Sequence, residues 1–186
     1  EFSVVCVPEG YTYVPDNNFE QALIDLDYDD VLNDFVLTAN ISGVTSLAVM
    51  EQGIDNLTGI EDFTALTWLD CQSNQLISLD MSANTALRDL YCFDNDLTSL
   101  DVSSNTVLED LNCYFNQLTT LDVSSNTALT SLECDGNSLT SLDVSNNTNL
   151  TRLHCTNNQL IHLNMKNGVT DALTTFDAKG NSLDCI

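Results

Sequence analysis

The sequence predicts a β-solenoid, a stack of short coils in which every coil adds one strand to a parallel sheet. Three observations predict this fold. Cysteines recur every 21 residues through the middle of the chain, an asparagine follows each of them three residues later, and leucines keep the same spacing. A fixed period of this length indicates structural repeats that stack on one another. The recurring pairs are Cys71 with Asn74, Cys92 with Asn95, Cys113 with Asn116, Cys134 with Asn137, and Cys155 with Asn158.

Each repeat reads L-x-x-L-x-C-x-x-N-x-L-x-x-L-D-V-S-x-N-T-x. A divergent unit opens the array, a stretched unit comes near its end, and a partial unit begins at Leu173. We therefore expect about six full repeats and one partial repeat over residues 44–186. The full units run over residues 44–65, 66–86, 87–107, 108–128, 129–149 and 150–172.

The spacing within a repeat indicates one strand and one return path. In x-x-L-x-C the Leu and Cys point into the core, while positions three, five and seven of the repeat point outward. One such strand per coil gives a parallel sheet on the concave side, with strands about 4.8 Å apart. The return segment is too short for an ordinary helix with two turns. We expect it to be extended or 3₁₀, with a possible second row of three-residue strands at Leu-Asp-Val. We name the two sides the strand face and the return face.

The segment before the repeats predicts a helical cap over residues 1–43. Asn17 with Glu20 three residues later is typical of a helix start. Phe19, Ala22, Leu23 and Leu26 then recur at helical spacing, so we expect a helix over residues 17–26. It would cover the apolar end of the first coil. No comparable cap follows the last repeat, and we expect the native protein to continue beyond residue 186.

The first eleven positions of the repeat resemble the leucine-rich repeat pattern L-x-x-L-x-L-x-x-N-x-L, with Cys in the third apolar place. The whole unit resembles the cysteine-ladder repeats of internalin J-like surface proteins, and more closely those of flavobacterial secreted and surface proteins. The entry segment 14–24 and the closing segment 181–186 resemble the two ends of such arrays. The resemblance implies a bacterial secreted or cell-surface protein, because family members are adhesins, host-interaction proteins and binding regions of larger secreted proteins. We expect that localisation, although this chain shows no signal peptide.

The charge of the chain argues against several classes of partner. Four Lys and Arg stand against 28 Asp and Glu, which gives a net charge of −24. Such a surface repels nucleic acid and anionic membranes, and no apolar run approaches the ~18 residues of a membrane span.

The sequence does not indicate an enzyme, because it contains only two histidines, His154 and His162, and no nucleophile motif or phosphate loop. We expect a monomer without a cofactor.

The cysteine column is predicted to be a row of buried, reduced thiols. Each coil supplies one thiol in a straight line, whereas zinc needs about four converging ligands. Directly stacked strands also give poor geometry for disulfides between coils. Zinc and disulfides remain alternatives to a packed thiol ladder. Cys6 and Cys185 lie at opposite ends of the stack, so they cannot pair within one monomer.

The outward strand positions carry the candidate binding site. They differ from coil to coil, whereas the return face repeats almost unchanged, and variety on a rigid sheet favours recognition. Clustered aromatic side chains are typical of protein and sugar interfaces. The alternative is that these rings only pack on one another and support the sheet. The candidate residues are Trp68, Tyr91, Phe93, Tyr114 and Phe115, with a polar rim of Arg88, Asp89, Asp94 and His154.

Two groups of aspartates are weak candidates for calcium. Asp80, Asp101, Asp122 and Asp143 form a column on the return face, where we expect each to accept N–H bonds within its own turn. The other group is Asp25, Asp27 and Asp29, which starts like a calcium loop. It has Asp30 where Gly is needed and Val36 where Glu is needed, so a polar turn is the favoured interpretation.

Together these observations predict a non-enzymatic binding or adhesion module that recognises a protein or carbohydrate partner through the strand face. The alternative is a structural spacer that holds another part of a larger secreted protein at a distance.

Overall fold

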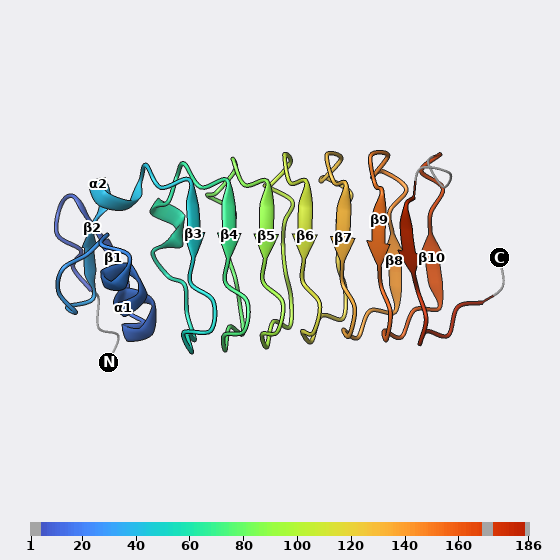
Figure 1. Ribbon diagram of the computed structural model, residues 1–186, viewed down its shortest axis with the longest axis horizontal. Coiled ribbons are helices and arrows are strands. Elements are labelled where there is room, and N and C mark those ends of the chain that lie inside the picture. Colours follow the sequence, from blue (N-terminus) through green and yellow to red (C-terminus); the bar gives the residue numbers. More distant parts are fainter. Residues whose placement is uncertain (1–4, 169–172, 185–186) are drawn as a thin grey trace.

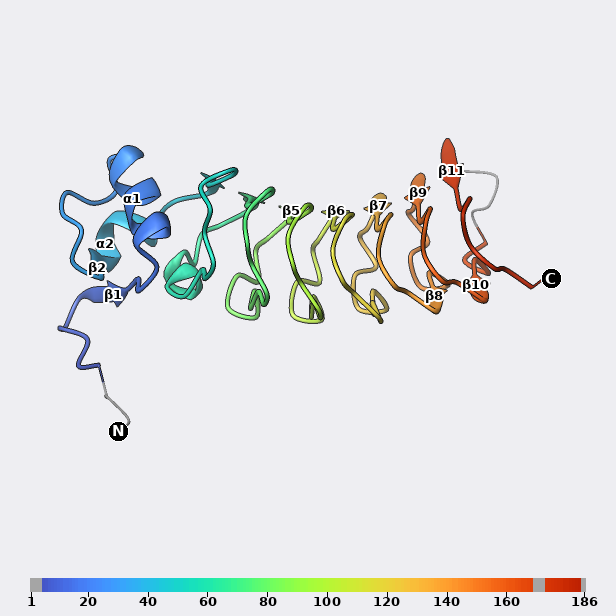
Figure 2. The same cartoon turned by 90° about the horizontal axis from the view of Figure 1, so that it is seen from below.

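The computed structural model shows a solenoid, and it describes residues 5–168 and 173–184. Seven three-residue strands form one parallel sheet in the order β11-β9-β7-β6-β5-β4-β3, which confirms the predicted fold (Figure 1). In Figure 2 the strands follow a shallow arc whose hollow side faces away from the return segments. The strands are β3 (Ser46–Ala48), β4 (Trp68–Asp70), β5 (Asp89–Tyr91), β6 (Asp110–Asn112), β7 (Ser131–Glu133), β9 (Arg152–His154) and β11 (Thr175–Asp177).

The core repeats with the strands. The central residue of each strand stacks on its neighbour in register, as Leu69 does on Leu90 and Leu90 on Leu111. The five ladder cysteines beside them are fully buried and unbridged, which confirms the predicted thiol ladder. Burial raises the pKa of these thiols, that of Cys155 to about 12. Cys6, near the N-terminus, is exposed, and Cys185 lies outside the described residues.

A buried asparagine column ties the coils together where the strands end. The Nδ2 of Asn95 donates to the carbonyl of Cys71 at 3.1 Å and to that of Cys92 at 3.2 Å. Its Oδ1 accepts from the backbone N–H of Leu76 at 3.0 Å. The asparagine therefore satisfies backbone groups of two successive coils, as a buried turn requires.

The return face is mostly extended. Its described residues include the 3₁₀ turn η1 (Ile60–Asp62), a parallel pair of strands, β8 (Ser141–Asp143) with β10 (His162–Asn164), and a bridge between Asp80 and Asp101. The strands are one residue earlier than the predicted Leu-Asp-Val. A second column of fully buried asparagines lies on this side, where Nδ2 of Asn105 donates to the carbonyls of Met81 and Asn84. The column is Asn84, Asn105, Asn126 and Asn147.

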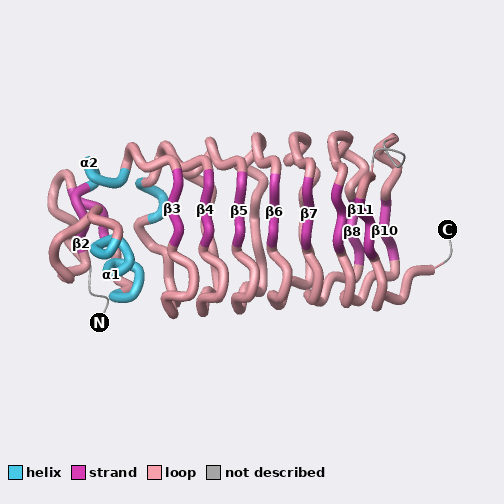
Figure 3. Tube along the Cα trace, viewed as in Figure 1, coloured by secondary structure: helices cyan, strands magenta, loops and turns pink. Residues whose placement is uncertain are grey.

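The N-terminal end contains a two-stranded antiparallel sheet, β1 (Tyr11–Tyr13) with β2 (Phe35–Leu37), and two helices, α1 (Asn17–Asp25) and α2 (Thr38–Ile41). Figure 3 shows the helical segments gathered at this end. The ring of Phe19 on α1 lies 6.4 Å from that of Phe63 in the first coil, so α1 packs on the open end of the stack. Leu26, expected on the buried face, is 40% exposed at the end of the helix.

Helix α1 begins at Asn17 as predicted, but the predicted capping of its start by Asn17 with Glu20 was wrong. Asp16 is the N-cap, and its Oδ1 accepts the N–H groups of Asn18 and Phe19 at 2.9 and 3.0 Å. The carboxylate of Glu20 turns to another loop, where Oε1 accepts the N–H groups of Asn33 and Phe35. Asp and Asn are about equally strong caps, so the sequence alone did not distinguish Asp16 from Asn17 as the capping residue.

Candidate functional site

The five candidate aromatic residues lie across the strand face in three consecutive coils. Trp68 begins β4, Tyr91 ends β5, Phe93 follows β5 by two residues, and Tyr114 and Phe115 follow β6. Four of them are half-buried, and Phe115 is 57% exposed. We call these five residues the aromatic strip.

The rings of the aromatic strip pack on one another in two groups. The ring centroids of Trp68 and Tyr91 are 5.9 Å apart and tilted. Phe93 stacks on Tyr114 at 4.2 Å, and Tyr114 meets the edge of Phe115 at 5.1 Å. Tyr91 ends β5 and Phe93 follows it by two residues, so the two groups are adjacent along the chain. The rings therefore support one another, as the alternative interpretation required, and still leave part of their surface open to solvent.

Phe115 is held in an unusual backbone conformation. Its φ is 49°, in the left-handed region that a bulky side chain rarely adopts. Its ring lies over Gly136 of the next coil, where an added Cβ would come within 2.4 Å of the ring. Equivalent positions in other coils are also left-handed and hold Ser73, Asp94 and Asn157. The repeat thus imposes this conformation, and only this coil places an aromatic ring there among the described residues.

Carboxylates fill the spaces between the rings. Trp68 is in register with Asp89 and Asp89 with Asp110, while Asp70 is in register with Tyr91. Burial raises the pKa of Asp70, Asp89 and Asp110, and Asp110 with other nearby carboxylates raises that of Asp89 further. Burial and the same aspartates raise the pKa of Tyr91 to about 12. The centre of the strand face therefore combines half-buried rings with crowded negative charge.

Two residues of the predicted polar rim already have partners, and a third lies away from the aromatic strip. Arg88, directly before β5, forms an ion pair with Glu109, directly before β6. Asp94 accepts a hydrogen bond from the hydroxyl of Ser73 at 2.9 Å. His154 ends β9, two strands beyond β6, so it lies outside the coils that carry the aromatic strip.

One group of described side chains has the composition of a metal site. Ligand atoms of Glu133, Asp135 and His154 lie within 4.8 Å of one another. Glu133 is already paired with Arg152 at 2.8 Å, and Asp135 accepts two bonds from Thr156. These existing partners compete with an ion, so the cluster carries no metal assignment.

The calcium candidates Asp25, Asp27 and Asp29 do not form such a group within the described residues. Asp25 accepts a hydrogen bond from Gln21 of its own helix at 2.9 Å. Asp27 is in a left-handed turn with φ of 62°. Burial, followed by the charge of Glu20, raises the pKa of Asp29. Asp27 and Asp29 line one hollow at this end of the molecule, whereas Asp25 bonds within its own helix.

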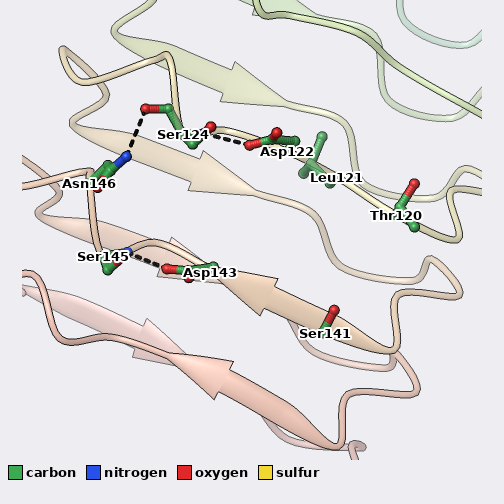
Figure 4. A pocket seen from close by; sticks show the side chains of 8 residues that line it. All are labelled: Thr120, Leu121, Asp122, Ser124, Ser141, Asp143, Ser145 and Asn146. Carbon is green, nitrogen blue, oxygen red and sulfur yellow. Dashed lines mark hydrogen bonds between the residues drawn. The ribbon is translucent and has the colours of Figure 1, made fainter.

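The return face carries shallow hollows between coils. The hollow in Figure 4, about 370 Å³, is lined by Asp122, Ser124, Asp143 and Ser145 among others. Asp122 accepts the N–H of Ser124 at 2.9 Å, and Asp143 that of Ser145 at 2.8 Å, as expected for aspartates bonded within their own turns. These side chains therefore stabilise the turns of the solenoid.

Comparisons with known structures agree with this architecture. The functional domain of InlJ from Listeria monocytogenes, which includes a cysteine ladder, superimposes with a TM-score of 0.86 over 95% of this chain at 39% identity. The chain is a leucine-rich repeat solenoid with a cysteine ladder. It spans 40% of the length of that relative.

Two further leucine-rich repeat structures share the fold at lower identity. Internalin C2 from L. monocytogenes matches with a TM-score of 0.68 at 18% identity, over 98% of this chain and 93% of its own. The ectodomain of an Arabidopsis thaliana membrane receptor kinase matches with a TM-score of 0.62 at 24% identity, over 69% of this chain and 17% of its own. No protein-family model and no curated protein matches the sequence.

Two strand-face residues of this cysteine-ladder solenoid, Asp110 and Asn112, were not among the predicted site residues. Both lie on β6, within the coils that carry the rings. The outward positions of each strand are the sequence signal that would have found them.

In the part of the chain that the structure describes, no helix has the length and apolar character needed to span a bilayer.

Proposed function

We propose that this chain is a non-enzymatic protein-binding module of a secreted or cell-surface bacterial protein, working as a monomer. The partner docks on the strand face, with the aromatic strip as its anchor. The observation that carries this proposal is the strip itself, in which five aromatic side chains share the outward face of three coils. Aromatic anchors on a rigid support contribute most of the affinity in many protein interfaces.

The strained Phe115 supports the same assignment. A left-handed Phe costs about 1–2 kcal/mol relative to an ordinary backbone conformation, and at 57% exposure more than half of the residue's surface stays open to a partner. Strain of this kind gathers at functional sites, where it serves binding rather than folding.

Analogy with structures of the same fold points in the same direction. The plant receptor ectodomain was solved in complex with CASPARIAN STRIP INTEGRITY FACTOR 2, and the similarity to it is one of fold alone. For this chain a net charge of −24 argues against nucleic acid as the partner.

A protein array probed with this chain, followed by matched variants, tests the proposal. Tyr91→Ala and Tyr114→Ala should each weaken binding to the proteins captured by about tenfold, the loss of more than ~1–2 kcal/mol typical of an aromatic anchor. Ser103→Ala and Ser124→Ala on the return face serve as controls and should bind like the parent. If both tyrosine variants bind every ligand like the parent, the strip is structural and the spacer interpretation is favoured. A carbohydrate array run beside it identifies a glycan ligand, which would contradict the proposal of a protein partner.

A further inference from the structure

We propose that the strand face from β4 to β6 is a docking surface for a basic polypeptide, whose Lys or Arg side chains lie against Trp68 and Tyr91 and pair with Asp89 and Asp110. This inference rests on the function proposed above and adds the chemistry of the partner.

The register of the sheet places a ring and a carboxylate side by side. Trp68 is the direct neighbour of Asp89, and Asp89 that of Asp110. Neighbouring strands are about 4.8 Å apart. A cation within about 6 Å of a ring centroid is attracted to the ring face, and a carboxylate gives it a charge-assisted hydrogen bond. One Lys or Arg side chain can therefore use both partners at once.

The surface is rich in hydrogen-bond acceptors, and in the described structure one buried acceptor beside it lacks a donor. Asn112 lies on β6 beside Tyr91, is only 9% exposed, and its Oδ1 has no hydrogen-bond donor among the described residues. The carboxylate of Asp110 has hydrogen bonds from Ser131 and Tyr91, the second long at 3.4 Å, and burial still raises its pKa. A partner that brings N–H donors and positive charge matches this surface. An anionic partner would bring further acceptors and further negative charge to it.

The cations of the chain do not neutralise this region by direct pairing. Three of its four Lys and Arg pair with other carboxylates: Arg88 with Glu109, Arg152 with Glu133, and Lys179 with Asp177. The charges of Arg88 and Arg152 stabilise the carboxylates of Asp89 and Asp110 only in part, because burial still raises the pKa of both. A cationic partner would lower the cost of keeping these groups ionised.

The shape of the region favours a polypeptide over a small cation. The hollows on the return face, and one beside Tyr28 and Phe35 at the N-terminal end, are lined by residues outside the aromatic strip. Small ligands are usually enclosed in a pocket, whereas an open, gently curved sheet suits the broad contact of a protein surface. The high negative charge would also speed the approach of a basic partner at low salt.

Three synthetic 12-residue peptides test the inference by fluorescence anisotropy at ~150 mM NaCl, near physiological screening. The first contains Lys and Arg in a Gly/Ser background, the second replaces them with acetyl-lysine and citrulline, and the third contains Glu. We expect the first to bind at least about tenfold more tightly than the second, because only the charge and its hydrogen bonds differ. Equal binding of the first two peptides would overturn the inference.

A matched pair of double variants locates the effect. Asp89→Asn with Asp110→Asn should weaken binding of the cationic peptide by about fivefold or more, since two ion pairs are lost. Asp101→Asn with Asp122→Asn on the return face makes the same change in charge at the same spacing in the sequence, and should weaken it by less than about twofold. Equal losses in the two pairs would mean general charge attraction and would overturn the inference. Melting temperatures confirm that all variants are folded.

The two proposals can fail separately. A protein from the array whose binding depends on Tyr91 and Tyr114 but not on Asp89 and Asp110 would overturn the basic partner and leave the proposed function standing. If no captured protein depends on the aromatic strip, the proposed function itself is wrong. Loss of array binding in both sets of variants supports both proposals.

Discussion

The strand face and the return face repeat with the same period, yet their aspartates are in opposite situations. On the return face Asp101 accepts the N–H of Ser103 at 2.9 Å, and the hydrogen bonds from that serine lower its pKa. On the strand face burial raises the pKa of Asp110, although Ser131 and, at 3.4 Å, Tyr91 hydrogen-bond to it. The return face satisfies its charges within each turn, whereas the strand face leaves them crowded among aromatic rings. The regular, locally satisfied residues stabilise the scaffold, and the crowded carboxylates are the reason why we place the proposed binding surface on the strand face.

The largest effect on stability is expected from the buried asparagine columns beneath the two faces, which can be compared directly. Asn116→Ala removes an amide that donates to the carbonyls of Cys92 and Cys113 and accepts from Leu97 N–H. Each buried group left without a partner costs about 1–3 kcal/mol, so we expect a loss of about 3 kcal/mol or more in the free energy of unfolding.

Asn126→Ala on the return side is the matched variant. It frees two carbonyls, those of Val102 and Asn105, and also removes an Oδ1 that has no donor among the described residues. We expect a loss of about 2 kcal/mol, smaller than for Asn116→Ala because fewer groups lose a partner. Urea unfolding measures both variants. A larger loss for Asn126→Ala would show that the return-side column is the stronger support.

The fold was predictable from sequence because one period governs every coil. Once the cysteines and leucines were aligned, strand alternation placed the aromatic residues on the outward face. The return-side asparagines were missed because Ser-x-Asn-Thr is typical of an exposed turn, although Asn84, Asn105 and Asn126 recur without exception. The division into a cap over residues 1–43 and an array over residues 44–186 stays a prediction.

The site was less predictable because its contacts depend on backbone angles. The left-handed position after each strand is visible in sequence only where it holds glycine, as in Gly136. At Phe115 the same angle turns the ring over the next coil, which no spacing rule indicates. Which acidic residues bond within their own turn also depends on local geometry, so the contrast between Asp101 and Asp110 appears only in the structure.

Phe115 gives a test of intermediate size. Asn fits a left-handed backbone better than Phe, as Asn157 does two coils further on. We expect Phe115→Asn to change the free energy of unfolding by less than about 1 kcal/mol, because relief of strain offsets the lost contact with Tyr114. Binding to an array partner should fall about tenfold.

The reverse change, Asn157→Phe, is the control for Phe115→Asn. It should destabilise the protein by about 1–2 kcal/mol, the cost of a left-handed Phe, and should leave binding unchanged. Thermal unfolding and array binding are measured for both variants. If Phe115→Asn destabilises strongly and binds normally, Phe115 is a packing residue. Its strained backbone would then no longer distinguish the strand face from the return face as a binding surface.

The smallest effect is the pH dependence of stability, in which the two faces should act with opposite signs. Asp89 and Asp110 have pKa values raised above 3.8, so their ionised forms are disfavoured in the folded protein. Their cost is present near neutral pH and is relieved as the pH falls through their raised pKa values. Asp101 and Asp122 have lowered pKa values. Their contribution is present above 3.8 and is lost as the pH falls through their lower folded pKa values.

Urea midpoints measured between pH 7 and pH 3 should therefore rise first and fall afterwards. The double variant Asp89→Asn with Asp110→Asn should flatten the rise, because it removes two of the crowded carboxylates. The double variant Asp101→Asn with Asp122→Asn should flatten the fall and keep the rise, because asparagine can accept the serine N–H at any pH. These differences between variants decide the matter, since the relief of general repulsion at a net charge of −24 also contributes to the rise. If the strand-face variant keeps the full rise, its carboxylates are not the crowded ones, and the electrostatic difference between the two faces would be contradicted.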